Sequence, residues 1–272
     1  MGINEILDSC WGHINEGAFG KSWSENWSED LRDLADGSDE EIEYLGDNLR
    51  EIFMRGKTGN RDQSSVSIAG RNWKKMLWAI CASLSTCGCT LPLFGRKMIQ
   101  STLNKQLLDT LKITIGKNDS LSITPDLIIL RFRTSNIEAD NLEDLKEIID
   151  NDFSFIESIN ILWSKTNFND NIKEYMLWSW IGEIQSKNKT PIIKFSWVTV
   201  PTNDPNKYGI GNAPLIRANS FNNGGFWGIG DVPELSMKSI IELIPDWKKN
   251  MNIYRNQGSG SKFMNSAFPK NN

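Results

Sequence analysis

Residues 122–132 read SITPDLIILRF, a short apolar run that opens with a Pro-Asp pair. The β-branched and aromatic residues of LIILRF are typical of a buried strand, and Pro125 favours a bend or a break just before it. Asp126 therefore stands at the first position of the strand. A carboxylate there either closes a turn or binds a cation such as a metal ion, and these residues alone leave both roles open.

The composition indicates an ordinary globular protein. The chain has 272 residues, of which 39% are hydrophobic and 24% are charged. This length is sufficient for one large domain with a substantial core. No apolar run approaches the roughly 20 residues that cross a bilayer. The N-terminus, MGINEILDSCWGHINEG, lacks the basic start and long apolar stretch of a signal peptide, so we expect a cytoplasmic location.

Cysteine and histidine usage argues against several enzyme classes. The four cysteines include no CxxC pair and His13 is the only histidine, so a zinc site would lack its usual ligands and we expect buried or idle thiols. A single histidine also argues against HNH-type nucleases, zinc hydrolases and most Ser-His-Asp enzymes. Neither a GxxxxGK[ST] loop nor a strand–GxGxxG–helix is present, which disfavours NTPases and Rossmann dehydrogenases.

Charge is distributed in blocks. Residues 1–52 carry 14 acidic and 3 basic residues, and residues 53–135 carry 4 acidic and 13 basic ones. Residues 136–183 are again acidic (11 against 3) and residues 184–272 are basic (11 against 5). Because distant charges are screened, a polyanion responds to the local field, and the two basic blocks could form one positive face. A chance separation of charges on solvated helices explains the same pattern.

Apolar periodicity and turn signals predict the secondary structure. Ser38-Asp39-Glu40-Glu41 is typical of a capping box that opens a helix with Ile42, Leu45, Leu49 and Ile52 on one face. A second helix carries Trp73, Leu77, Ile80 and Leu84. The other predicted elements are helices in 97–111, 141–163, 169–187 and 235–250, a strand or a strand pair kinked at Pro125 in 121–132, a strand in 191–200, and a long Gly/Asn/Pro-rich loop in 201–234.

These elements predict an α/β fold, or an α+β fold, with a small mixed central sheet flanked by many helices. We expect one domain over residues 1–272, with an acidic helical part in residues 1–60 and a flexible tail in residues 256–272. The Trp-rich segment KSWSENW (21–27) is expected to supply core or interface residues rather than stacking platforms for bases, because it falls in the acidic block.

The predicted strand PIIKFSWVTV supplies Lys194, with 67 residues between it and Asp126. A carboxylate binds Mg²⁺ and an ammonium stabilises charge on a phosphate, so metal-dependent phosphodiester hydrolysis can use this pair. Pro125-Asp126 before LIILRF, together with Lys194 in IIKFSW, resembles the PD-(D/E)XK nucleases. Within them the chain is most similar to type II restriction endonucleases that cut sites with a CCGG core. GRNWKKMLWAI (70–80) would correspond to the helix before the Asp strand.

The resemblance implies a Mg²⁺-dependent enzyme with a restriction-endonuclease-like fold. The family normally has an acid two residues before the lysine, where this chain has Ile192. In the CCGG group a carboxylate further along the chain often replaces it. Asp204 is the nearest substitute, and Glu183 at the end of the preceding predicted helix is a second. The implied catalytic residues are therefore Asp126, Lys194, Asp204 and Glu183, with Asp126 and Asp204 as the Mg²⁺ ligands.

The loop in residues 201–234 is the candidate for reading DNA. Its amides and basic side chains are of the types that contact base edges and phosphates, although a surface loop without a partner explains them equally well. The residues expected to contact DNA are Lys207, Asn212, Arg217, Asn219 and Asn222. By resemblance we also expect double-stranded DNA as substrate, a homodimer and a cognate methyltransferase as a separate protein.

Two other functions stay open. A non-catalytic protein that binds DNA or a protein partner fits the missing acid beside Lys194. DNA binding that is indifferent to Mg²⁺, without cleavage, would favour it. A hydrolase or transferase of another type predicts a small-molecule pocket and no affinity for DNA.

Overall fold

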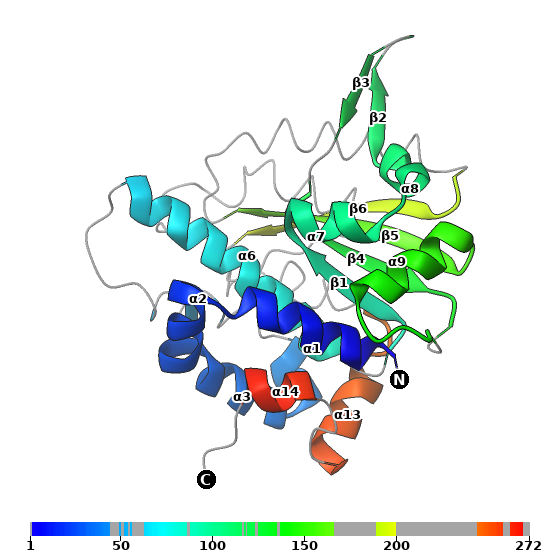
Figure 1. Ribbon diagram of the computed structural model, residues 1–272. Coiled ribbons are helices and arrows are strands. Elements are labelled where there is room, and N and C mark those ends of the chain that lie inside the picture. Colours follow the sequence, from blue (N-terminus) through cyan, green and yellow to red (C-terminus); the bar gives the residue numbers. More distant parts are fainter. Residues whose placement is uncertain are drawn as a thin grey trace.

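The computed structural model describes residues 2–43, 49, 52, 53, 55, 63–85, 88–115, 117, 119–122, 125–134, 137–165, 189–199, 244–257 and 262–268. Its centre is a mixed four-stranded sheet in the order β1–β4–β5–β6 (Figure 1). These strands are β1 (Thr90–Phe94), β4 (Leu127–Phe132), β5 (Ile156–Lys165) and β6 (Ile192–Thr199). β4 runs antiparallel to β1 and β5, and β6 runs parallel to β5. The predicted mixed sheet with flanking helices is confirmed.

The stretch 121–132 forms two strands that belong to different sheets. β3 (Asp119–Ser122) pairs with β2 (Lys112–Ile115) in a separate two-stranded hairpin, and β4 lies inside the main sheet. Residues Leu127 to Leu130 of β4 are at most 1% exposed, which fits a continuous apolar run covered on both faces. Of the two alternatives for this stretch, the pair separated at Pro125 is the one observed.

Helices flank the sheet. The long helix α6 (Gln63–Ser85) packs along β1, and α7 (Gly95–Thr102) and α9 (Leu142–Asn151) pack against each other (Figure 1). The apolar face predicted for the second helix, from Trp73 to Leu84, is buried. Among the described residues, no helix combines the length and the apolar character that crossing a bilayer requires.

The acidic N-terminal part is helical where it is described. Its helical segments are α1 (Ile3–Ile14), α2 (Gly17–Ser22), the π-helix η1 (Trp23–Trp27), α3 (Ser28–Asp36) and α4 (Asp39–Glu43). The predicted capping box is present: Ser38 N donates to Glu41 Oε2 (2.5 Å) and Glu41 N donates to Ser38 Oγ (3.2 Å). The hydrogen bond from the Ser38 backbone lowers the pKa of Glu41. Ile42, Leu49 and Ile52 are buried as expected; Leu45 lies outside the described residues.

An aromatic core joins these N-terminal helices to α6. Trp23 and Trp27 are buried, as predicted for KSWSENW. Trp78 of α6 stacks on Trp11 of α1, with ring centroids 6.2 Å apart and planes 11° apart. The Trp78 indole also donates to the carbonyl oxygen of Pro92 in β1 (2.8 Å), so this one side chain connects α6 with α1 and with the main sheet.

The C-terminal segment differs from the expected flexible tail. α13 (Trp247–Gln257) is followed by α14 (Lys262–Ala267), which packs on α1. Phe263 is fully buried against the rings of Trp11 and Trp78. Trp23 Nε1 donates to the carbonyl oxygen of Ala267 (2.6 Å). The prediction of a flexible tail is wrong for residues 262–268, because the aromatic core binds them.

Three further predictions need correction. Residues 97–111 form two helices, α7 and α8 (Lys105–Thr110), because Asn104 caps the second: its Oδ1 accepts from Leu107 N (2.9 Å). The predicted helix over 141–163 is helical only in α9, and its second half is β5, since sheet pairing overrides the local pattern. The C-terminal helix begins at Trp247, and residues 235–243 lie outside the described part.

The two fully buried cysteines, Cys10 and Cys81, are free thiols, and burial raises the pKa of each to about 12. This confirms the expected buried thiols at these two positions. Thiols with such pKa values are protonated at neutral pH and chemically inert.

We predict that Phe263→Ala lowers the free energy of unfolding by about 3–5 kcal/mol, the usual effect of removing a buried aromatic ring. Lys262→Ala, at an exposed neighbouring position, should change it by less than about 0.5 kcal/mol. Urea denaturation followed by tryptophan fluorescence measures both. Equal, small effects would contradict the docking of α14 in the core.

Candidate functional site

Backbone contacts fix Asp126 at one end of the sheet. β1 ends at Phe94, which lies opposite Leu127 at the start of β4. Gly95 N then donates to the carbonyl oxygen of Asp126 (2.8 Å). Gly95 has a positive φ of 73°, a conformation that other residues adopt only with strain, so glycine permits α7 to begin directly after β1. Pro125 is buried, and Asp126 is held where β1 ends and β4 begins.

The side chain of Asp126 meets a lysine from α6. Lys74 Nζ donates to Asp126 Oδ1 at 2.8 Å, and the two side chains are 29% and 33% exposed. A pair so accessible to water contributes little to stability, about 0–1 kcal/mol. Because it stays open to solvent, a ligand can reach both charges. The structure therefore joins a carboxylate and an ammonium at the end of the sheet.

Lys194 occupies a different place. Lys194 of β6 lies opposite Asn160 of β5. Asp126 immediately precedes Leu127 of β4, which lies opposite Leu162 of β5. Along β5 the two positions are therefore offset by about three residues, or about 10 Å. β5 lies between their strands as well. The lysine that contacts Asp126 is Lys74, and the predicted role of Lys194 at the same site stays a prediction.

The other predicted site residues lie outside the described part of the chain. These are Glu183 and Asp204, expected to complete the catalytic set, and the DNA-contacting residues Lys207, Asn212, Arg217, Asn219 and Asn222. Their predicted roles stay predictions.

The described residues do not complete a magnesium site. Asp126 is the carboxylate at this end of the sheet, and its partner at 2.8 Å is an ammonium, which cannot bind a cation. Mg²⁺ requires about six oxygen ligands, several of which are waters. Within the described ranges, no three His, Cys, Asp or Glu residues are grouped so that they could hold a metal ion.

Lys75, next to Lys74, has a structural role. Its Nζ donates to the carbonyl oxygen of Ile14 at the end of α1 (2.6 Å) and lies 5.0 Å from the centre of the Phe19 ring. Burial lowers the pKa of Lys75, and the nearby Glu16 opposes this effect. A cation at the C-terminus of a helix also interacts favourably with the helix dipole. The two adjacent lysines of GRNWKKMLWAI thus point to different partners.

The sequence contained only a weak signal for Lys74. Two lysines interrupt a helix whose neighbouring residues Trp73, Met76 and Leu77 are fully buried, and partly buried lysines need partners. Adjacent residues on a helix are rotated by about 100°, so only one of them can face the start of β4. The sequence does not say which one.

An unpaired amide lies inside the sheet beside Lys194. Asn160 is 4% exposed, and neither polar atom of its side chain has a hydrogen-bond partner in the described structure. A buried polar group without partners costs about 1–3 kcal/mol. Such a group in a native structure calls for an explanation, for example a role in binding or catalysis.

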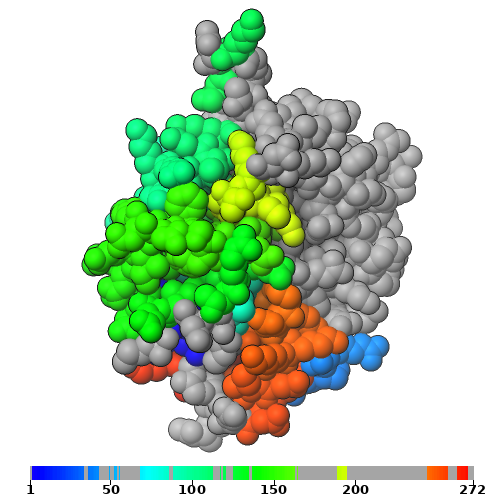
Figure 2. All heavy atoms as spheres, turned by 90° about the vertical axis from the view of Figure 1, so that its right-hand side faces the viewer, coloured from blue at the N-terminus to red at the C-terminus, as the bar shows by residue number. Residues whose placement is uncertain are grey.

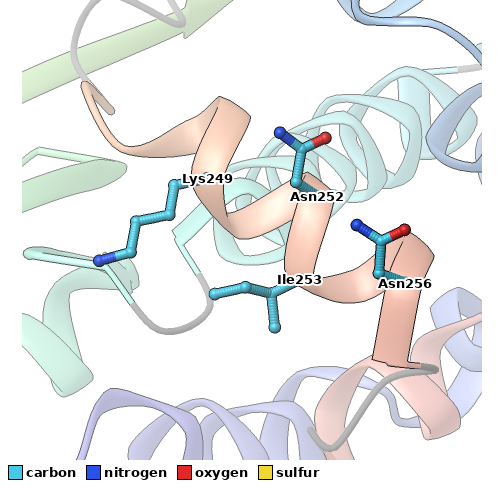
Figure 3. Close-up of a pocket in the computed structure, with 4 residues that line it drawn as sticks. All are labelled: Lys249, Asn252, Ile253 and Asn256. Carbon is cyan, nitrogen blue, oxygen red and sulfur yellow. The ribbon is translucent and has the colours of Figure 1, made fainter.

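A hollow of about 450 Å³ lies on α13. The described residues that line it are Lys249, Asn252, Ile253 and Asn256, which project from one side of the helix (Figure 3). Asn250 anchors this helix by donating from Nδ2 to the carbonyl oxygen of Leu84 in α6 (2.6 Å). Leu84 follows Lys74 by ten residues, about 15 Å along the helix, so the hollow is separate from the Asp126–Lys74 pair.

We predict different effects for the two adjacent lysines. Lys75→Met should lower the free energy of unfolding by about 1–3 kcal/mol, because a charged hydrogen bond and a cation–π contact are lost. Lys74→Met should lower it by at most about 1 kcal/mol. Chemical denaturation of the two variants provides the comparison, and the reverse order would refute this assignment.

Asn160→Leu should raise the melting temperature, because it removes an unpaired buried amide at similar volume. Ser85→Ala is the control, because the Ser85 hydroxyl is buried and hydrogen-bonded. Its Oγ donates to the carbonyl oxygen of Cys81 (2.8 Å) and accepts from Thr90 Oγ1 (3.0 Å), so its loss should lower the melting temperature. Differential scanning calorimetry measures the melting temperatures of both variants. A lower melting temperature for Asn160→Leu would show that the amide is hydrogen-bonded in solution.

No protein-family model matches this chain, and no curated protein and no solved structure is significantly similar to it.

Proposed function

We propose that this chain is a Mg²⁺-dependent type II restriction endonuclease whose cleavage centre lies at the start of β4. The observation that supports the proposal is the solvent-accessible Asp126–Lys74 pair at the end of the sheet. In the proposal Lys74 takes the role that the resemblance would assign to Lys194. The resemblance of Pro125-Asp126 and the following strand to the PD-(D/E)XK nucleases supplies the reaction class.

The chemistry follows from the two charges. Hydrolysis of a phosphodiester adds negative charge to the phosphate in the transition state, and the Lys74 ammonium stabilises charge that develops within its reach. The Asp126 carboxylate orients a water by accepting its hydrogen bond. The proposal keeps Mg²⁺ as cofactor, with the ligands other than Asp126 supplied from outside the described residues, where Asp204 and Glu183 are the candidates.

The remaining parts of the proposal follow from the resemblance. The substrate is double-stranded DNA with a short specific sequence, and Lys207, Asn212, Arg217, Asn219 and Asn222 contact it. Two copies of the chain act together, since two-fold protein symmetry matches a palindromic site. A separate methyltransferase protects the host DNA, and the enzyme works in the cytoplasm.

A second candidate is a non-catalytic DNA- or protein-binding protein. The Asp126–Lys74 contact also fits a purely structural ion pair that closes the turn before β4. Ile192 favours this reading too: it is 45% exposed on β6, where a nuclease of this family would normally carry an acid.

Cleavage of plasmid and phage DNA tests the proposal, with Mg²⁺ and with EDTA. We expect discrete fragments that require Mg²⁺. Asp126→Asn and Lys74→Met should each reduce the rate by about 100-fold or more, as loss of a charge-stabilising group does. Glu157→Gln is the matched control, because Glu157 pairs with Arg131 at 2.8 Å at the other end of β4, and the side chains of this pair are 36% and 35% exposed. It should leave the rate within about threefold.

Lys194→Ala decides between the two lysines. If Lys194→Ala abolishes cleavage and Lys74→Met does not, the catalytic role of Lys74 is wrong. Intact DNA under all conditions, together with DNA binding that does not depend on Mg²⁺, would establish the non-catalytic alternative.

A further inference from the structure

The β2–β3 hairpin projects from the body of the protein. Both views show it standing beyond the helices and the main sheet (Figures 1 and 2). It pairs from Lys112 opposite Ser122 to Ile115 opposite Asp119 and belongs to its own two-stranded sheet. α8 packs against β2. A two-stranded hairpin is marginally stable by itself in water, so an arm of this kind is expected to serve contact with a partner.

The dimensions of the hairpin fit the major groove of duplex DNA. Each strand has four residues and is therefore about 13 Å long at 3.3 Å per residue. The two strands are about 5 Å apart, and side chains widen the ribbon further. The major groove of B-DNA is about 12 Å wide and admits a two-stranded β-ribbon.

The charge of the hairpin and its supports favours a polyanion. Residues 95–122 contain five basic and two acidic residues, a net charge of +3. Arg96 and Lys97 are exposed on α7, Lys105 is exposed on α8, and Lys117 is exposed between the two strands. Lys112 bonds Asp109 (2.6 Å) at the base of the arm. Lys117 lies further out along the arm than this ion pair, and an accessible lysine is of the type that binds a phosphate.

The hairpin leads directly to the Asp126–Lys74 pair. β3 ends at Ser122, four residues before Asp126, a span of at most about 14 Å for an extended chain. Because Asp126 is fixed to the sheet through Gly95, the end of β3 lies within this span of a fixed point. A duplex that holds the arm in its groove would have its backbone within reach of both charges.

We propose that the β2–β3 hairpin inserts into a groove of duplex DNA and thereby positions the backbone at Asp126 and Lys74. This inference rests on the proposed function and specifies the element that docks the substrate. The sequence pattern pointed to the loop in residues 201–234 for this purpose; the hairpin is an additional contact on the opposite side of Pro125 in the chain.

The test measures binding of a short fluorescein-labelled duplex of mixed sequence by anisotropy, in EDTA and over a series of salt concentrations, with the full-length Asp126→Asn protein as background. Lys117→Ala should weaken binding and lower the slope of log affinity against log salt by about one. Replacing residues 113–121 with a short Gly-Ser turn should weaken binding by about tenfold or more. Lys21→Ala, at an exposed α2 lysine with 74% side-chain exposure, should leave affinity and slope unchanged.

Unchanged affinity and slope in both hairpin variants, with circular dichroism showing folded protein, would overturn the inference. So would normal DNA binding combined with loss of self-association in sedimentation, since the arm would then join two copies through its open strand edges. In these cases cleavage that still depends on Asp126 leaves the proposed function intact. A background protein that binds no duplex at all counts against both.

Discussion

The fold depends on the environment of Trp78. This side chain is fully buried in α6 and contacts three separate parts of the chain: the Trp11 ring of α1, the Phe263 ring of α14 and the Pro92 carbonyl of β1. Aromatic pairs of this kind are worth more than the burial of their area alone, and the indole N–H finds the partner it needs. Both ends of the sequence are thereby held on one helix, and that helix is held on the sheet.

The same helix connects the core to the candidate site. Lys74 lies one turn before Trp78, so the packing that fixes Trp78 also fixes the backbone that presents the ammonium to Asp126. Asp126 is fixed from the other side, through Gly95 at the junction of β1 and α7. The two charges are therefore presented by two rigid elements that share a core. Such support is what a reactive pair requires in order to keep its geometry.

Polar side chains are buried inside the main sheet. Among the described residues, the Asn160 amide and the Ser164 hydroxyl, four residues further along β5, have no hydrogen-bond partner. Buried polar side chains also occur in the first half of the chain, for example Ser83, Ser85 and Thr102. β5 carries three buried polar side chains, Ser158, Asn160 and Ser164, and its sequence also shows the apolar spacing of a helix. Local sequence is a weak guide where a buried strand carries polar residues.

The sequence by itself determined the elements whose signals are local. The capping box at Ser38, the apolar face of α6, and the strands β4 and β6 were predictable because caps, helical periodicity and β-branched runs act over a few residues. Tertiary structure decided the rest. β5 became a strand because β4 and β6 pair with it, and residues 262–268 became ordered because an aromatic core accepts Phe263. The lysine that meets Asp126 was decided by the register of the sheet, which offsets Lys194 by three residues, and by the rotation of α6, which turns Lys74 toward the start of β4. Register and helix rotation are set by contacts distant in sequence, and so no local pattern contains them.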